Sequence, residues 1–471
     1  MTSASPSPSD AQHPVLPETI LAALRAEDRE VLVDICRQAH PGDIEAAFEQ
    51  LGEEERETFL HALPIGVLTE LTDYLPAAAI ERRVRSLSQD ERREVLESMS
   101  DDELVDLLQE VSDEERPELI ELLPEDMREI SADLLQFDEH TAGGRMTTAI
   151  AKIRASMTIR EALAQLKEQQ EETEILSRIY VVDNEGRLLG KIRLRDLAFN
   201  PRSANVEEFM DGDQIAIQAI ADQEEAAQMI ARYDMLALPV VDSEFHLLGV
   251  ITHDDALDIL EEEHTEDIER ASGIAGDRGD FAYLQTPVTT HLRRRFFWVL
   301  GLAFMSLFSG FVMHRYESVF TAHFILALYL PMVVAAGGNT GAQAATMVIR
   351  SMSLGELAPR SFWRVIWKEM RIGLMLGGLL GICIALQIQF FLPKGLFGID
   401  SNASLLHLAG VVALALTVQV TSSTFLGAAL PLGAKAFRLD PAVVASPAIT
   451  SFVDVTGMFI YFTLARWLLA F

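Results

Sequence analysis

Asp454 is an acidic residue inside an apolar run from Ala442 to Phe471, which is long enough to cross a membrane. The twelve-residue separation between Ala442 and Asp454 corresponds to about 18 Å of helix, close to the centre of a hydrocarbon slab about 30 Å thick. A charge at that depth costs about 2.5–3.5 kcal/mol on insertion scales, so such groups usually face a water-filled path or an ion. We interpret Asp454 as a cation ligand in a pore; a protonated carboxyl bonded to a neighbouring helix is the alternative.

A second polar interruption lies in the apolar segment expected near residues 324–347. There Pro331 is followed by the sequence GGNTGAQ at residues 337–343. Irregular backbone at membrane depth is tolerated where it is buried in protein or lines a wet cavity, so we expect a broken helix beside the pore. Close helix packing through the glycines is the alternative. The candidate pore-lining residues are Gly337, Gly338, Asn339, Gln343, Ser446 and Thr450.

The ligand types around these segments favour a hard cation. One carboxylate with amides, hydroxyls and carbonyls, and without His or Cys nearby, offers oxygen ligands only, which suits Mg²⁺ or Ca²⁺. Mg²⁺ retains much of its water shell, so a single Asp454 from each subunit of a symmetric dimer would be sufficient. These residue types do not separate Mg²⁺ from Ca²⁺ or Mn²⁺. The polar residues 417–424 predict that the fourth apolar segment contacts water or a polar partner.

Five apolar segments are expected after Arg295, near residues 296–313, 324–347, 372–392, 405–430 and 443–469. Basic residues concentrate before the first segment and in the second and fourth connections. The positive-inside rule therefore places residues 1–295 in the cytosol and the carboxyl terminus outside, in a multi-pass protein of the plasma (inner) membrane. Residues 1–16 are rich in Ser and Pro and do not have the pattern of a signal peptide, so we expect a disordered leader.

Charge divides the chain into two parts. Residues 281–471 contain 13 Lys and Arg against 6 Asp and Glu, a net of +7. The preceding residues contain 25 basic and 65 acidic side chains, a net of −40. An acidic soluble part without a basic patch argues against nucleic acid binding. No nucleophile–base pair, phosphate loop or metal-binding histidine motif is apparent, so we do not expect an enzyme. The two cysteines, Cys36 and Cys383, do not suggest a disulfide framework.

The soluble part contains an internal repeat. The sequence VVDNEGRLLG at residues 181–190 returns as VVDSEFHLLG at residues 240–249, a spacing of 59 residues. Each copy predicts a buried strand, a turn, a second strand (191–194 and 250–253) and a helix that opens with an acidic residue. The arrangement resembles a pair of CBS domains over residues 146–264. Such pairs commonly bind adenine nucleotides or ions.

The residues on either side of the repeat are strongly acidic. Residues 17–136 predict short amphipathic helices, with S-x-x-E capping boxes that begin at Ser100 and Ser112. Acidic residues at helical spacing in 254–269 would repel one another on one face, and a divalent cation would relieve that repulsion. We therefore expect an ion sensor whose compact state is favoured by Mg²⁺. A solvated acidic surface is the alternative.

The order of these parts resembles the MgtE family of magnesium channels. The motifs that carry the resemblance are Pro331 with residues 337–343, and Asp454-Val455-Thr456-Gly457. The implied fold is multidomain: an α-helical superhelical N-terminal domain, an α/β CBS-domain pair and an all-α transmembrane domain of five helices. The expected boundaries are 1–16 for the leader, 17–140 for the N domain, 141–203 and 204–264 for the CBS units, 265–294 for a connecting helix and 295–471 for the pore domain.

The resemblance implies a homodimer in the lipid bilayer, a pore at the dimer axis, selectivity for Mg²⁺ and closure by cytosolic Mg²⁺ bound between the soluble domains. Asp454 matches the family's pore aspartate. Two positions depart from the family's pattern. Ser446 stands where the family often has Asn. Met235 stands where an aromatic ring can stack on adenine, so binding of ATP is expected less than binding of Mg²⁺. The acidic positions that match the family's cytosolic sensor are Glu70, Asp102, Asp106, Asp222, Glu224, Asp234, Asp255, Asp258, Glu263, Glu266 and Asp267.

Three classes of function remain after the sequence is considered. The leading one is a Mg²⁺-selective channel that cytosolic Mg²⁺ closes. The second is a carrier of another divalent cation, Mn²⁺, Co²⁺ or Ca²⁺, that is coupled to a proton or Na⁺ gradient. The third is a membrane-tethered ion or nucleotide sensor without transport, which would leave the buried carboxylate of Asp454 unexplained.

Overall fold

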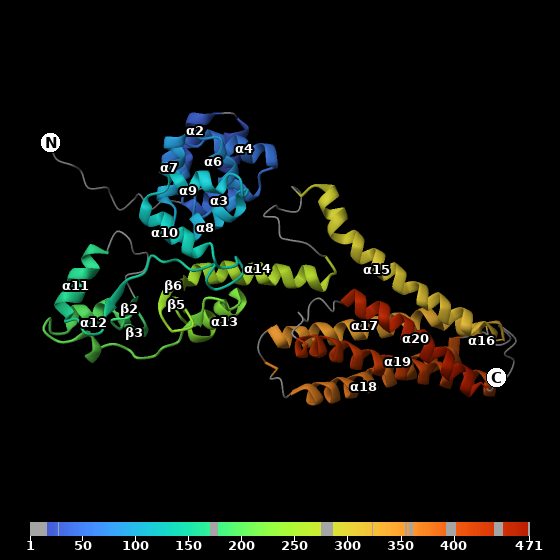
Figure 1. Cartoon of the computed structure of the whole chain (residues 1–471). Coiled ribbons are helices and arrows are strands. Elements are labelled where there is room, and N and C mark those ends of the chain that lie inside the picture. The colour runs from blue at the N-terminus through green and yellow to red at the C-terminus, as the bar shows by residue number, and fades with distance from the viewer. Residues whose placement is uncertain are drawn as a thin grey trace. The chain divides into compact units, whose positions relative to one another are not determined.

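The computed structural model describes residues 17–26, 28–169, 178–274, 286–322, 324–353, 356–357, 361–391, 402–437 and 446–469. The chain forms two compact units. The first comprises Met1–Glu263 with Gly279–Thr286, and the second comprises His264–Arg278 with Pro287–Phe471. Each unit is described separately below, with the elements labelled as in Figure 1.

Ten short helices form the N-terminal helical array of the first unit (Figure 1). Helices α1 to α9 bury apolar side chains in a shared core, in which the ring centroids of Phe48 and Phe59 lie 5.9 Å apart. Leu134 of α10 is buried instead in the core of the second α/β repeat described below. The helices are α1 (Pro17–Arg25), α2 (Arg29–Cys36), α3 (Pro41–Glu49), α4 (Glu53–Ala62), α5 (Ile65–Leu68), α6 (Ala77–Arg85), α7 (Gln89–Ser98), α8 (Asp101–Glu110), α9 (Arg116–Leu122) and α10 (Glu125–Leu134).

The expected capping boxes at Ser100 and Ser112 are wrong. Ser100 precedes α8, but its side chain makes no capping hydrogen bond, and α9 begins only after Glu115. Reciprocal capping boxes are formed instead by Ser88 with Glu91 and by Thr158 with Glu161. The S-x-x-E pattern predicts which side chains can cap a helix, but competing partners nearby determine which of them do so.

Two similar α/β repeats complete the first unit. The first repeat contains β1 (Lys152–Arg154), α11 (Ile159–Glu168), β2 (Arg178–Val182), β3 (Leu188–Arg193) and α12 (Leu194–Phe199), followed by the short 3-10 helix η1 (Val206–Glu208). The second contains β4 (Ile217–Gln218), α13 (Gln223–Tyr233), β5 (Ala237–Val241), β6 (Leu247–Thr252) and α14 (His253–Ala271). The part of α14 from His264 onwards belongs to the second unit. In each repeat the first strand pairs parallel with the second, and the second pairs antiparallel with the third.

The two repeats also share a close backbone approach. A Cβ atom at Gly190 would lie 2.2 Å from the carbonyl oxygen of Asp211, and one at Gly249 would lie 2.5 Å from that of Thr147. In both places a further segment bridges to the edge strand, as Lys191 with Asp211 and Thr147 with Val250. The second of these bridges fixes the chain just after the helical array to the sheet of the second repeat. The predicted strand–turn–strand–helix units are therefore confirmed, with each second strand beginning earlier than expected.

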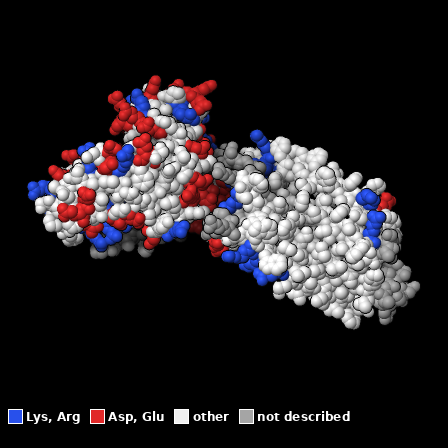
Figure 2. All heavy atoms as spheres, turned by 60° about the horizontal axis from the view of Figure 1, so that its bottom comes forward, with Lys and Arg blue, Asp and Glu red and all other residues white. Residues whose placement is uncertain are grey.

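The second unit contains the helices α15 (Val288–Arg315), α16 (Glu317–Ala322), α17 (Ile325–Ser353), α18 (Phe362–Phe391), α19 (Asn402–Ala436) and α20 (Ser446–Leu468). Five of them, all except α16, are long and apolar enough to cross a membrane. This confirms the five expected segments, although the helices extend beyond most of the expected ends. The protein is a multi-pass membrane protein. Figure 2 shows a largely uncharged surface over this unit, with basic side chains gathered at its ends.

The expected break in the second apolar segment is wrong. α17 continues through residues 337–343 without interruption and also contains Pro331. The glycines serve close packing instead, because a Cβ at Gly341 would lie 3.2 Å from the carbonyl oxygen of Ser423 in α19. The interpretation of tight helix packing, rather than irregular backbone, is the correct one.

The chain from Arg270 to His291 is not one continuous helix. α14 ends at Ala271, the next residues form a turn, and α15 begins at Val288. Residues 275–285 of the expected connecting helix lie outside the described residues. At the ends of this stretch, Glu269 of α14 accepts a hydrogen bond from Arg294 of α15 over 2.5 Å. This ion pair lies within the second unit.

α19 lies at the centre of the membrane helices. It packs against α17, α18 and α20, as Figure 1 shows for this unit. Its fully buried side chains include Val412, Val420 and Gln419. In contrast, α15 has no buried residue in this single chain and contacts mainly α20.

Candidate functional site

Asp454 lies in the middle of α20, where α17 approaches closely. On α17, Gly338 lies beside these residues: a Cβ atom there would lie 2.9 Å from Thr450 Cγ2 and 3.6 Å from Asp454 Oδ1. The glycine therefore leaves room beside the carboxylate that a larger side chain would fill. The structure thus brings together three of the predicted pore residues, Gly338, Thr450 and Asp454, on the facing sides of two membrane helices.

The remaining predicted pore residues are distributed differently. Asn339 and Gln343 are exposed on this chain and lie four residues apart, on one face of α17. Gly337 instead faces the interior of the helix bundle, against α19. Ser446 begins α20, and its side chain lies outside the described atoms. An exposed face of α17 that carries two amides, on a helix that packs against α20 with its Asp454, is an arrangement that suits a hydrated cation.

Gln419 of α19 is a buried polar residue that the sequence did not single out as a site residue. Its side chain is fully buried, and its Nε2 donates a hydrogen bond to the carbonyl oxygen of Val453, next to Asp454, over 3.0 Å. A Cβ at Gly337 would lie 2.5 Å from this nitrogen and one at Gly457 would lie 2.4 Å from it. The two glycines thus form a slot for the amide. Because a carbonyl can only accept, the hydrogen bond also fixes which way the amide points.

Four hydroxyl groups among residues 417–424, those of Thr417, Thr421, Ser423 and Thr424, bond to helix backbone. Thr417 donates to the carbonyl oxygens of Ala413 and Gly377, and Thr424 donates to that of Glu369 in α18. These hydroxyl groups therefore have protein partners. The expected polar partners are present for these hydroxyl groups, and the contact with water stays a prediction.

A second candidate site lies between the N-terminal helical array and the second repeat, within the first unit. Arg145 donates from Nε to Gln223 Oε1 over 3.0 Å and from Nη2 to Glu262 Oε2 over 2.7 Å. Its Nη1 lies 3.7 Å from Asp106 Oδ2 in α8. Gln223 in turn donates to Glu263 over 2.6 Å. A network of ionic and amide groups therefore connects α8 with α13 and α14.

The carboxylates around this network ionise less readily than usual. Burial raises the pKa of Asp106 to about 6, although Arg145 acts in the opposite direction. Burial likewise raises the pKa of Asp255, and it raises that of Asp258 together with the charges of Asp255 and Glu262. The interface thus carries more negative charge than Arg145 neutralises. A bound divalent cation would reduce this repulsion.

The other predicted sensor residues of the first unit lie in turns or at the ends of helices. Glu70 is exposed in a turn after α5, and Asp102 lies in the first turn of α8. Asp222 caps the start of α13, where it accepts a hydrogen bond from the amide of Glu224, whereas Asp234 ends the same helix in the left-handed conformation with φ of 52°. Twelve residues of helix correspond to about 18 Å, so Asp222 and Asp234 do not share one site.

Two predicted sensor residues belong to the second unit. Glu266 pairs with Arg270 one turn further along α14, and Asp267 accepts a hydrogen bond from Ser353 of α17 over 3.4 Å. Within the described part of the chain, no cluster of three or more His, Cys, Asp or Glu side chains is arranged to hold a metal ion. The assignment of individual sensor ligands therefore stays a prediction.

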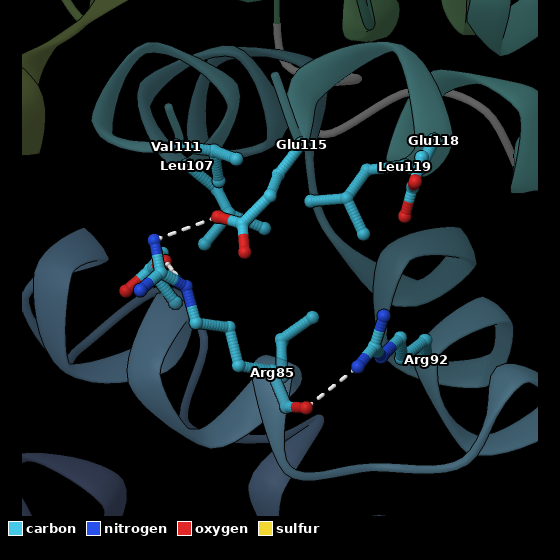
Figure 3. Close-up of a pocket in the computed structure, with 9 residues that line it drawn as sticks. Arg85, Arg92, Leu107, Val111, Glu115, Glu118 and Leu119 are labelled. Carbon is cyan, nitrogen blue, oxygen red and sulfur yellow. Dashed lines mark hydrogen bonds and ion pairs between the residues drawn. The ribbon is translucent and has the colours of Figure 1, made fainter. Parts of the chain in front are cut away.

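A pocket in the helical array lies apart from these residues. Figure 3 shows Arg85 paired with Glu115 over 2.8 Å and Arg92 bonded to the backbone of Arg85 over 2.6 Å. Glu81, which also lines the pocket, pairs with Arg85. Arg85 is thus paired with two acidic residues of the lining, and none of the predicted site residues lines this pocket.

Comparison with known proteins extends over nearly the whole chain. The family described as MgtE, divalent cation transporter, matches residues 330–464, the MgtE intracellular N domain matches residues 39–140, and the CBS domain matches residues 142–201 and 206–262. The chain is 35% identical over 459 residues to the magnesium transporter MgtE of Thermus thermophilus, covering 95% of this chain and 97% of that protein. The chain belongs to the MgtE family.

Another MgtE family member, the magnesium transporter MgtE of Enterococcus faecalis, is 31% identical over 336 residues, which cover 71% of this chain and 70% of that protein. Among solved structures, the cytosolic domain of the Mg²⁺ channel MgtE in complex with ATP is 34% identical and has a TM-score of 0.47. It covers 52% of this chain and all of that structure. The relatives are transport proteins, which agrees with the expectation that this MgtE family member is not an enzyme.

Proposed function

We propose that this MgtE family member is a homodimeric channel that conducts Mg²⁺ across the plasma membrane through a pore beside Asp454. The observation that carries the proposal is the position of Asp454 in α20, with the side-chain-free Gly338 of α17 and Thr450 around it. A carboxylate in the middle of a membrane helix needs an ion, a proton or a polar partner. The name of the Thermus thermophilus relative, a magnesium transporter, supports Mg²⁺ as the ion.

The same proposal includes closure of the pore by cytosolic Mg²⁺. Support comes from the interface of α8, α13 and α14, where burial and mutual repulsion raise the pKa of Asp106, Asp255 and Asp258. Mg²⁺ that binds the compact arrangement more tightly than the separated one shifts the population towards the compact one. The positive-inside rule supports a cytosolic amino terminus and an external carboxyl terminus. ATP is a ligand of the solved relative, and for this chain it is the weaker proposal because Met235 replaces an aromatic ring.

The test is uptake of Mg²⁺ into liposomes that contain the purified full chain, with and without millimolar Mg²⁺ on the cytosolic face. We expect wild-type flux, and we expect Asp454→Ala and Asp454→Asn to abolish it while the protein still elutes as a folded dimer. Glu317→Gln, which removes a carboxylate that is 68% exposed in the same unit, is the matched control and should keep its flux. Retained flux in both Asp454 variants would refute the pore assignment.

The same vesicles separate this proposal from its alternatives. A coupled carrier of Mn²⁺, Co²⁺ or Ca²⁺ would need a proton or Na⁺ gradient, whereas a channel conducts without either. The absence of flux for every ion and gradient would leave the membrane-tethered sensor. Flux that does not respond to cytosolic Mg²⁺ would retain the pore and reduce the acidic clusters to a solvated surface.

A further inference from the structure

We propose that Arg145 is a built-in cation of the sensor interface, which supplies part of the positive charge that Mg²⁺ would otherwise have to provide. This inference rests on the proposed closure by Mg²⁺ and adds a residue that sets how much Mg²⁺ is needed. It is carried by the contacts of one guanidinium group with three helices. Arg145 bonds Gln223 of α13 and Glu262 of α14 and faces Asp106 of α8.

The backbone around Arg145 is hydrogen-bonded to the second repeat. The amides of Ala142 and Gly143 donate to the carbonyl oxygens of Ala221 and Ala219, each over 2.8 Å, and Thr147 pairs with Val250 of β6. We call the array docked when it contacts the second repeat, as it does in this structure. The guanidinium is therefore held on the surface of the second repeat whether or not the helical array is docked. Only its contact with Asp106 crosses to the array. The interaction of Arg145 with Asp106 can thus stabilise the docked arrangement without a large movement of Arg145.

The positive charge of Arg145 lies in a partly buried place among acidic side chains. Its side chain is 22% exposed and that of Asp106 is 35% exposed, so their interaction is only partly screened by water. Asp106 also experiences the negative charges of Glu262, Glu139 and Asp255. A single positive charge reduces this repulsion but leaves several carboxylates for a divalent cation. By contrast, Thr148 crosses the same interface to Asp101 with a neutral hydroxyl group.

Removal of the Arg145 charge should weaken docking most when no divalent ion is present. The compact arrangement would then lose its one guanidinium contact to Asp106, while the separated arrangement would lose no contact across the interface. More Mg²⁺ is consequently needed to reach the same compact fraction. The expected rise in the Mg²⁺ concentration at half-docking is about two- to fivefold, the size expected for a partly exposed ion pair.

The experiment is hydrogen exchange of the full chain in lipid nanodiscs, followed by mass spectrometry over a Mg²⁺ titration that starts in EDTA. The readout is amide protection in α8 and in the first half of α14. Arg145→Gln retains a polar side chain but loses the charge, and it should shift half-protection to higher Mg²⁺. Arg145→Lys retains the charge without the guanidinium fork and should stay close to wild type, which a purely packing role would not produce.

Arg187→Gln is the matched control, because Arg187 also pairs with acids, Glu185 and Glu244, in the turns of the two repeats. Arg187→Gln changes the net charge by the same amount as Arg145→Gln. It should leave the Mg²⁺ concentration at half-protection unchanged. An unchanged midpoint in Arg145→Gln would overturn the inference, as would a lowered one, which would mean that the guanidinium competes with the ion. Since the readout is docking rather than flux, a chain that conducts no Mg²⁺ would refute the proposed function without deciding the role of Arg145.

Discussion

The acidic residues at the sensor interface illustrate how burial can outweigh a neighbouring opposite charge. Arg145 lies 3.7 Å from Asp106, yet the pKa of Asp106 rises to about 6 because its burial disfavours the ionised form more strongly. For Asp258, burial and the charges of Asp255, Glu262 and Glu261 all act in the same direction. The ionised forms of these residues are therefore destabilised in the docked arrangement, and a bound proton or cation would relieve that destabilisation.

The raised pKa of Asp106 predicts how docking depends on pH without divalent ions. The ordinary pKa is 3.8, so the docked arrangement binds a proton more tightly than the separated one does. Docking should strengthen as the pH falls from about 7 through about 6, with the gain from this group complete below about 4. Asp106→Asn should dock more strongly in EDTA at pH 7 and show a smaller pH dependence.

Fluorescence energy transfer between dyes on the exposed positions Glu57 and Asn184 would measure this docking in the full chain. The charged groups that act on Asp106 are Arg145, Glu262, Glu139 and Asp255. A dye pair whose transfer efficiency is independent of pH between 5.5 and 7.5 in EDTA, or falls on acidification, would contradict the prediction.

Among the membrane helices, the packing of α18 on α19 depends on glycines four residues apart. Gly373, Gly377 and Gly381 all face α19, where a Cβ at Gly377 would lie 2.8 Å from the Cα of Thr417. Gly378, the next residue, has open space at its Cβ position. A comparison of substitutions at Gly377 and Gly378 thus separates the effect of helix packing from the effect of replacing a glycine within a helix.

We expect Gly377→Ala to destabilise the helix bundle by about 1–3 kcal/mol, because a rigid backbone atom of α19 must move. Gly378→Ala should be neutral or slightly stabilising, since alanine favours the helix. Thermal unfolding of the full chain in detergent, read as the temperature at which the chromatographic peak of the folded protein is lost, compares the two. Equal Tm values for both variants would show that the two helices are not held at this separation.

The helices and strands could be predicted from local patterns, whereas several details of the site depend on contacts between distant residues. Apolar runs identified the five membrane helices, and the repeat at 181–190 and 240–249 identified the paired strands. The sequence at 337–343 does not show that Gly337 faces Gln419, so the same glycines predicted a broken helix. Arg145 was not singled out, because its partners Asp106 and Glu262 lie 39 and 117 residues away in the chain.

At the scale of the whole molecule, charge is divided between an acidic soluble part and a basic membrane part. The formal net charge of −33 is the sum of −40 for residues 1–280 and +7 for residues 281–471, so the acidic part repels itself at low ionic strength. Any salt screens such repulsion, whereas an ion sensor responds to Mg²⁺ specifically. This difference separates the sensor hypothesis from a solvated acidic surface.

Mg²⁺ should therefore stabilise the soluble part beyond the effect of ionic strength. An ion that binds only the compact folded state adds about 2.7 kcal/mol of stability at one hundred times its dissociation constant. We expect millimolar MgCl₂ to raise the unfolding temperature of the full chain more than NaCl of equal ionic strength. The combined variant Asp106→Asn, Asp255→Asn and Asp258→Asn should lose most of this difference while being at least as stable as wild type in EDTA, because its buried charges are gone. Differential scanning calorimetry of both proteins in the two salts measures the contrast. If MgCl₂ and NaCl raised the unfolding temperature of the wild type equally, screening alone would explain the effect. The acidic residues would then serve solubility rather than ion sensing.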